Sequence, residues 1–363
     1  MKSGIVSYGA ALPRCRLRST EILNVWNNTQ AFMIKKLGYE ERGVLYPDQD
    51  TITLAIDAGQ VALERAGVSV NLVDALILGT GTNPYQTKAS STVIAEALGL
   101  PKQIFSFDLQ FAGKSGTSAM IMAQALVDSG KARYALAIGA DTINRHVNPG
   151  HLWEYGASAG AVAFLIGTEG VIATISGSAS YAQDQSDYFR LEGERFMQVG
   201  SGFIGYVSGW GIADNCTPAV QALFKQCQLS PEDIQACALH QQSFVTPMFI
   251  SGPLKLNVRE TVINYILTPR IGDLGAASSL LALAYILDEG EADRNILLVG
   301  YGHGAGADAV MLKTTDLLDD ALDSYEDQRF VDDVLEDKFF VDYATSLKYE
   351  FKMQRSEMLG GVL

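Results

Sequence analysis

Apolar and polar residues alternate along the chain in blocks that predict helices followed by buried strands. Residues 118–139 read as an apolar helix, an acidic and glycine-containing end near Asp128, a short polar loop and a continuously apolar strand. Residues 278–300 have the same order, and their strand at 296–299 is again apolar at every position. Strands of this kind are covered on both faces, so helices must flank them. The pattern therefore predicts a layered α/β fold.

These segments belong to an internal repeat. Gly300 follows Gly139 by 161 positions (300 − 139), at the end of the matching strands. In a second pair of helix, loop and strand segments, Leu229 follows Val68 by 161 positions (229 − 68). Any α/β protein contains helix–strand units, but that alone does not explain one common offset. We therefore expect a duplicated chain.

The repeat divides the chain into three parts. We expect an N-terminal half at residues 1–170, a C-terminal half at 171–315, and an extension at 316–363 that contacts a partner protein. In the extension, residues 319–337 are rich in acids and predict an exposed helix. Residues 349–353 alternate apolar and charged side chains, which predicts an edge strand able to pair with a partner's sheet. A solvated extension is the alternative.

Composition restricts the function classes. The 363 residues are 48% hydrophobic and carry a formal net charge of −14, so a large core is expected and nucleic acid is an improbable partner. The longest apolar runs are too short to span a bilayer, and the first residues read as a strand and turn rather than a signal peptide. We expect a cytoplasmic protein.

The cysteines and histidines give no sign of a metal or disulfide site. The four cysteines are Cys15, Cys216, Cys227 and Cys237, and none forms a C-x-x-C pair. No histidine pair has zinc-finger spacing. None of the cysteines lies in a glycine-rich turn between a strand and a helix, the setting that activates thiols. We therefore expect reduced cysteines and no bound metal or cofactor.

One segment resembles a known family of condensing enzymes. Residues 107–117 read Phe-Asp-Leu-Gln-Phe-Ala-Gly-Lys-Ser-Gly-Thr and resemble the nucleophile segment of the thiolase superfamily, above all of archaeal and bacterial 3-hydroxy-3-methylglutaryl-CoA synthases. The resemblance covers roughly residues 2–315 and implies the thiolase-like fold, two duplicated α/β halves in an αβαβα arrangement. In those synthases the position of Gly113 holds the acyl-accepting cysteine. Glycine has no side chain that could be acylated.

The other family positions are also altered, with one exception. The resemblance places Gly81 where the synthases have the glutamate that acts as general acid and base. It places Asp273 where they have an asparagine, and an ionised aspartate would repel a developing oxyanion. Only His240, at the end of a predicted strand, matches the family's histidine. Either it lines a remnant acyl-CoA pocket or donates to a carbonyl, or it is an inherited residue held by hydrogen bonds.

A more specific resemblance is to the synthase-like subunits of bacterial phloroglucinol C-acetyltransferase complexes, which act in antibiotic biosynthesis. It rests on residues 111–118, on Gly272 with Asp273, and on residues 341–351. This resemblance implies a non-catalytic, homodimeric subunit beside a thiolase-like catalytic subunit and a small OB-fold protein of zinc-ribbon type. Any CoA thioester would then be handled by the complex.

Two other functions remain open. The first is an autonomous acyl-CoA condensing enzyme of the 3-hydroxy-3-methylglutaryl-CoA synthase or ketoacyl synthase III type with a rerouted nucleophile. The second is a regulatory acyl-CoA-binding protein.

Further motifs carry weaker signals. Ser115 is a candidate nucleophile, but the second glycine of a G-x-S-x-G elbow is misplaced, so a helix-start role is expected. The loop at residues 302–308 predicts a tight turn rather than a dinucleotide site, because a strand follows it. Within it, His303 either lines the cavity or is structural. His146 and His151 flank a loop and are expected at the surface.

Overall fold

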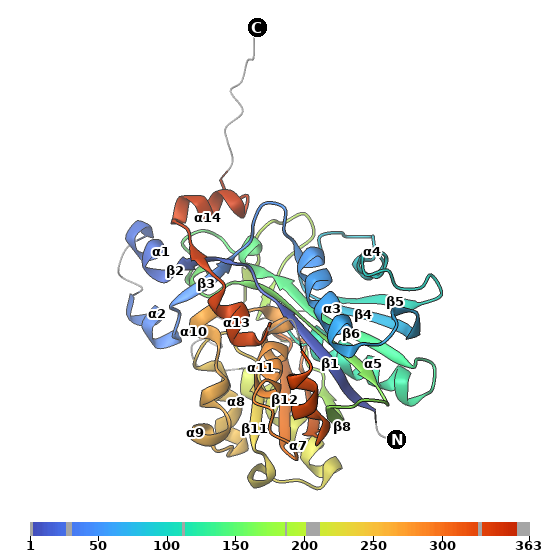
Figure 1. Ribbon diagram of the computed structural model, residues 1–363. Helices are drawn as coiled ribbons and strands as arrows, with labels where there is room; N and C mark the ends of the chain where they lie inside the picture. Colours follow the sequence, from blue (N-terminus) through green and yellow to red (C-terminus); the bar gives the residue numbers. More distant parts are fainter. Residues whose placement is uncertain are drawn as a thin grey trace.

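The computed structural model describes residues 3–26, 31–110, 113–185, 187–200, 211–325 and 329–353. Figure 1 shows the predicted alternation of strands and helices. Within the described residues, nine strands form one sheet in the order β11-β12-β13-β8-β1-β7-β6-β4-β5. Their bounds are β1 Gly4–Ala11, β4 Val73–Thr80, β5 Phe105–Gln110, β6 Tyr134–Thr142, β7 Ala159–Gly167, β8 Ala173–Tyr181, β11 Ala236–Leu239, β12 Asn295–Tyr301 and β13 Ala307–Thr314.

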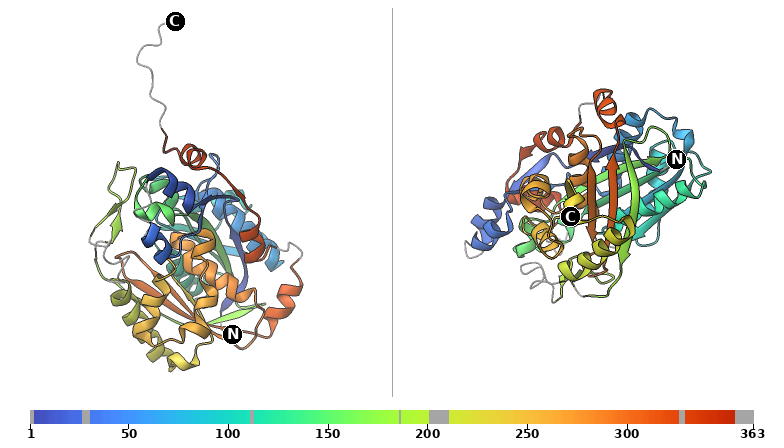
Figure 2. Two further views of the ribbon diagram at one scale, coloured as in Figure 1. Left: turned by 90° about the vertical axis from the view of Figure 1, so that its left-hand side faces the viewer. Right: turned by 90° about the horizontal axis from the view of Figure 1, so that it is seen from below.

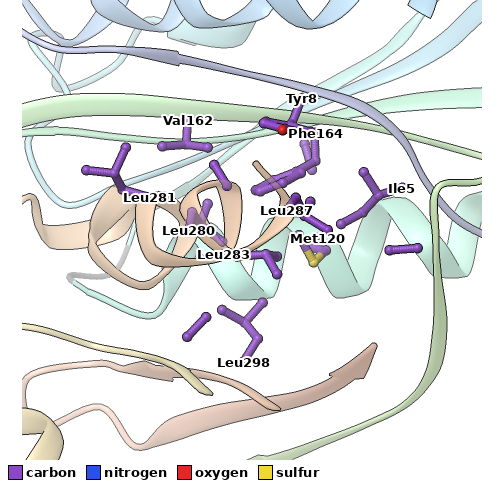
Figure 3. Packing of buried hydrophobic residues seen from close by; sticks show 14 of the residues in the cluster. Ile5, Tyr8, Met120, Val162, Phe164, Leu280, Leu281, Leu283, Leu287 and Leu298 are labelled. Atoms are coloured by element: carbon purple, nitrogen blue, oxygen red, sulfur yellow. The ribbon is translucent and has the colours of Figure 1, made fainter. Parts of the chain in front are cut away.

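The sheet consists of two halves that are joined only where β1 meets β8. That junction has two residue pairs, Gly4 with Thr174 and Ile5 with Ala173. Two helices, α5 (Ser115–Asp128) and α11 (Ser278–Leu287), lie between the halves. Figure 3 shows α11 leucines and Met120 packed between Tyr8 and Phe164 on one side and Leu298 on the other. These side chains are nearly inaccessible to solvent, so the predicted layers are confirmed.

One long helix covers the outer face of each half. The helix α3 (Thr51–Ala66) packs on β1 and β7, and α7 (Ile212–Cys227) packs on β8 and β13. Figures 1 and 2 show α7 on the outer side of the second half. The two helices begin 161 positions apart (212 − 51) and end 161 positions apart (227 − 66). The duplication inferred from the strands and loops therefore extends to the outer helices.

Local sequence signals set the ends of α3. Asp50 accepts a hydrogen bond from the Thr53 backbone N–H, and the Thr53 side chain accepts one from the Asp50 backbone, which forms a capping box. Gly67 ends the helix in the left-handed conformation that glycine adopts without strain. The Asp50 side chain at one end and the Gly67 backbone N–H at the other thus satisfy backbone groups that the helix leaves unpaired.

A smaller region covers one end of the sheet. Here β2 (Cys15–Arg18) pairs with β3 (Glu41–Val44) and with β14 (Phe339–Phe340) from the C-terminal extension. A separate hairpin pairs β9 (Tyr188–Phe189) with β10 (Gln198–Val199). In the described parts of the chain, the remaining α-helices are α1 Ser19–Trp26, α2 Ala31–Leu37, α4 Ser90–Ala97, α8 Thr246–Leu254, α9 Val258–Thr261, α10 Thr268–Ile271, α12 Leu317–Asp323, α13 Val331–Glu336 and α14 Tyr343–Tyr349.

The C-terminal extension differs from its prediction. Residues 343–349 form the helix α14 and a turn follows, so the edge strand predicted at 349–353 is wrong. The acidic segment 319–337 contains most of α12 and the whole of α13 rather than one exposed helix, and it buries Leu335. The alternation that suggested a strand has another cause: Glu350 and Lys352 are fully buried with Arg42, where their charges pair. Within the described ranges, no helix is long and apolar enough to cross a membrane.

Candidate active site

The residues singled out in the sequence come together where the two halves meet. Gly81 follows β4, His240 follows β11, and His303 lies in the turn between β12 and β13. Gly113 precedes α5, and Asp273 precedes α11. The C-terminal ends of parallel strands and the starts of the central helices thus converge, as the duplicated fold requires.

His240 and His303 are in direct contact. Their Nε2 atoms lie 3.1 Å apart, and both side chains are buried. Burial lowers the pKa of His240 to about 3, and burial together with the neighbouring His240 lowers the pKa of His303 well below its usual value. Both rings are therefore neutral near pH 7, and one Nε2 can donate to the other. The side-chain amide of Gln242 contacts Nδ1 of His303 on the far side of that ring.

The turn that carries His303 has a strained backbone. His303 adopts φ 52°, a left-handed conformation that costs a residue with a side chain roughly 1–3 kcal/mol. A hydrogen bond of 2.8 Å from Gly302 N–H to Gly306 C=O closes the turn. The tight turn predicted for this loop is confirmed, and it directs the His303 ring toward His240.

Gly113 faces this histidine pair. A Cβ atom at position 113 would lie 1.9 Å from the carbonyl oxygen of Tyr301 and 2.6 Å from Cδ2 of His303. Gly113 also has φ 42°, which side chains other than glycine rarely adopt. The position that resembles the family's cysteine site therefore has no room for a side chain in this arrangement.

Asp141 is a site residue that the sequence analysis missed. Its Oδ1 accepts hydrogen bonds from Gly81 N–H at 2.8 Å and from the Thr82 hydroxyl at 2.6 Å, and its Oδ2 accepts from Ala276 N–H at 2.8 Å. Burial raises its pKa, although these hydrogen bonds oppose the shift. Asp141 fixes the Gly81 loop of one half to the start of the central helix of the other. An acidic residue at the end of an otherwise apolar strand was the available signal.

Asp273 is also fully buried. Its Oδ1 accepts a hydrogen bond of 2.9 Å from Gly275 N–H, and the Trp153 side chain is a second hydrogen-bond donor to the carboxyl group. Burial raises its pKa to about 7, with repulsion from Asp141 in the same direction. This shift favours the neutral form of the carboxyl group, and the repulsion of an oxyanion by an ionised Asp273 stays a prediction.

A cavity of about 960 Å³ opens beside the histidines. Its lining includes Gly81 and His303, as well as Asp187, which lies just before β9, and Tyr188, the first residue of β9. The Tyr188 ring packs against His303 at a centroid distance of 4.0 Å, with the two ring planes tilted by 40°. Asp187 accepts a hydrogen bond of 2.9 Å from the Tyr301 hydroxyl, and burial raises its pKa to about 6. The cavity therefore presents a carboxyl group that exchanges protons near neutral pH.

The side chains considered as replacement nucleophiles are not activated. Burial raises the pKa of the Cys15 and Cys216 thiols, and it raises that of Cys237 to about 12. Ser115 begins α5 as expected, and its buried hydroxyl has no hydrogen-bond partner among the described residues. Within the described chain, none of these four side chains has a base positioned to deprotonate it.

Two further histidines differ from their prediction. His146 is half-buried, and its Nδ1 lies 3.2 Å from the carbonyl oxygen of Arg195. His151 is also half-buried, and its Nδ1 accepts a hydrogen bond of 3.1 Å from Trp153 N–H. Neither is a fully exposed surface residue, because the ring of each forms a hydrogen bond with the backbone of a loop.

Comparison with known proteins identifies the family. Residues 38–150 match the model of the thiolase N-terminal domain. The chain is 35% identical to hydroxymethylglutaryl-CoA synthase of Methanocaldococcus jannaschii over 352 residues, which cover 97% of this chain and 99% of the relative. It is 32% identical to the synthase of Pyrobaculum aerophilum, with 96% and 97% covered.

The chain belongs to the hydroxymethylglutaryl-CoA synthase family. Solved structures agree on the fold of this family. MvaS in complex with 3-hydroxy-3-methylglutaryl coenzyme A superposes with a TM-score of 0.86 at 19% identity, covering 97% of this chain and 92% of that one. FabH of Pseudomonas aeruginosa, a 3-oxoacyl-(acyl carrier protein) synthase III, gives a TM-score of 0.77 at 22% identity, covering 87% and 99%. The thiolase-like fold expected from the sequence is confirmed.

The family relationship corrects the expected function. A non-catalytic subunit of a phloroglucinol C-acetyltransferase was expected from the altered site residues. The relatives that match nearly the whole chain are instead named hydroxymethylglutaryl-CoA synthase, which points to an autonomous synthase-type enzyme. The altered character of positions 81, 113 and 273 and the remnant role of His240 stay predictions. The thiolase-like and OB-fold partner proteins remain predictions.

Proposed function

We propose that the chain is an autonomous acyl-CoA condensing enzyme of the hydroxymethylglutaryl-CoA synthase type that binds its acyl donor without forming a covalent bond to it. The observation that carries this proposal is the cavity at the junction of the halves, where Asp187 and His303 face the same space. The full-length match to synthases supports the reaction class. Because position 113 is a glycine, the reaction has to proceed without an acylated cysteine at that position.

Asp187 is suited to the proton transfers of such a reaction. Its carboxylate accepts a proton from the α-carbon of an acyl-CoA, and the resulting enolate attacks the ketone carbon of a 3-oxoacyl thioester. One carbon–carbon bond forms, and the new alkoxide takes the proton back from Asp187. Water then hydrolyses one thioester bond and releases free CoA. A positioned acid and base contributes roughly 10²–10⁴-fold to a rate, with a pKa near the working pH giving the best balance.

The test supplies the purified chain with acetyl-CoA and acetoacetyl-CoA and measures 3-hydroxy-3-methylglutaryl-CoA by mass spectrometry. Formation of this product, with the intact mass of the protein unchanged, is the expected result. Asp187→Asn should lower turnover by about 10²-fold or more while the KM for acetyl-CoA changes little. Asp184→Asn is the matched control, because Asp184 lines the same cavity but is exposed.

Two results would contradict the proposal. Absence of condensation product from well-folded protein would remove the assigned reaction. A stoichiometric acyl adduct would instead show a covalent route, and peptide mapping would then locate the nucleophile.

Self-association as a homodimer remains a proposal. The strand β5 forms one edge of the main sheet, and the Phe105 side chain on it is exposed. Pairing of two such edges would cover this strand in both copies. Light scattering of the purified chain should give twice the mass of one chain, and Phe105→Glu should shift it toward the monomer.

A further inference from the structure

Three side chains that can bind a metal meet behind the cavity. His240 and Asp273 are fully buried, and His303 is 4% exposed. Each offers one ligand atom, and these three atoms lie within 4.8 Å of one another. They come from a strand end, a helix start and a turn, so the tertiary structure alone brings them together.

One buried polar atom of this cluster, Nδ1 of His240, lacks a hydrogen-bond partner within the part of the chain that the structure describes. The carboxyl group of Asp273 has the Trp153 side chain and the Gly275 N–H as hydrogen-bond donors. A buried polar atom without a hydrogen bond costs about 1–3 kcal/mol, and such atoms in a native fold call for a ligand, an ion or ordered water. A cation bound by the cluster would offset the buried negative charge of Asp273.

We propose that His240, His303 and Asp273 bind a Zn²⁺ ion. Two ligands of a tetrahedral zinc ion lie roughly 3.3 Å apart, and the two Nε2 atoms are separated by 3.1 Å. No two of the three ligand atoms are more than 4.8 Å apart, so a point exists that lies within roughly 2.8 Å of each of them. This distance is less than about 1 Å longer than a Zn–N bond. Two histidines and one carboxylate form a ligand set typical of catalytic zinc.

Gln242 supplies support outside the ligands. Its side-chain amide contacts Nδ1 of His303, and its Oε1 has no other partner in the described residues. With the amide turned, Oε1 accepts a hydrogen bond from Nδ1–H of His303, which leaves the lone pair of Nε2 free for a metal. Carbonyl groups that orient a metal-binding histidine in this way are a regular feature of zinc sites.

The cavity gives the ion a function. Catalytic zinc keeps one position for substrate or water, and His303 lies on the cavity wall. A thioester carbonyl bound at that position would be polarised, which favours enolate formation without an acyl-cysteine. This use of the ion rests on the proposed function, whereas its binding does not.

The test measures metal directly. Chelator-treated protein is equilibrated with ZnCl₂, separated from free ion, and analysed by inductively coupled plasma mass spectrometry. We expect one zinc per chain, and with CoCl₂ the visible absorption of four-coordinate Co²⁺. Asp273→Asn and His240→Gln should each weaken Zn²⁺ binding at least about tenfold. His151→Gln is the control, because His151 lies outside the cluster and should leave binding unchanged.

Melting temperatures show whether a variant that fails to bind zinc is still folded. Zn²⁺ should raise the melting temperature of the wild-type chain and of His151→Gln, but not that of Asp273→Asn, which keeps the size of the side chain. Less than a tenth of an equivalent of zinc in folded wild-type protein, or equal binding by all variants, would overturn the site. Zinc binding without condensation would overturn the proposed function alone, and condensation by zinc-free protein would overturn only the catalytic use of the ion.

Discussion

The ring of His303 occupies the space into which a side chain at Gly113 would project. The two residues are far apart in the sequence, yet a Cβ atom at position 113 would lie 2.6 Å from the His303 ring. The absence of a side chain at position 113 is therefore a condition for the present place of the His303 ring, which contacts the buried His240 there.

This relationship predicts the effect of a side chain at position 113. Gly113→Ala should lower the free energy of unfolding by more than the roughly 1–3 kcal/mol that a strained backbone costs, because the added methyl group also meets the Tyr301 carbonyl. Gly130→Ala is the matched control: Gly130 has φ 71° but nothing within 4 Å of its added Cβ. Urea unfolding gives the loss of stability of each variant. The loss in Gly130→Ala reports backbone strain alone, and the additional loss in Gly113→Ala reports the steric clash of the added methyl group. Equal losses would show that position 113 has room.

The buried ion pair of Arg42 and Glu350 predicts how the C-terminal extension is held. Nη1 of Arg42 contacts Oε1 of Glu350, and Lys352 lies 2.9 Å from Oε2. Glu350→Gln leaves two buried cations undercompensated, which should cost about 3–5 kcal/mol. Asp337→Asn removes the exposed pair with Arg14 and should cost at most about 1 kcal/mol. Thermal unfolding of the two variants measures both losses of stability. An equally small loss of stability in both variants would contradict the assigned role of Glu350.

The same pair predicts loss of stability in acid. Burial alone would raise the pKa of Glu350, but the charges of Arg42 and Lys352 outweigh it and hold the pKa below its usual value. A carboxyl group with a lowered folded-state pKa stabilises the fold above its unfolded pKa, and that stability is lost as the pH falls through the folded value. Limited proteolysis below pH 4.5 should therefore release the extension before the core unfolds. Simultaneous cleavage throughout the chain would argue against this order.

Asp288 predicts a pH dependence of the opposite sign. Burial raises its pKa from 3.8 to about 6, although its hydrogen bonds with Tyr8 and Val331 oppose the shift. The folded state then holds a proton that the unfolded state has released, so stability decreases as the pH rises from 3.8 to 6. Asp288→Asn should flatten this slope in urea titrations at several pH values. Asp128→Asn, at the exposed equivalent position of the repeat, should retain the wild-type slope.

Much of the fold could be predicted because its causes are local. The apolar runs at residues 135–138 and 296–299 have no polar position that could face water, so each had to become a covered strand. The repeat offset follows from the sequence in the same direct way. The sequence also placed His240 at a strand end and predicted the tight turn around His303.

Only the tertiary structure decided what those residues do together. His240, Asp273 and His303 are separated by 33 and 30 positions (273 − 240 and 303 − 273), so no spacing rule connects them, and their contact depends on the packing of two halves around α5 and α11. The alternation of apolar and charged residues at 349–353 led to the wrong prediction of a strand. Charged residues of a buried ion pair and the polar face of a strand give the same polar–apolar pattern in the sequence. Burial also set the protonation of Asp273 and Asp187, since a pKa depends on the surroundings that the fold creates.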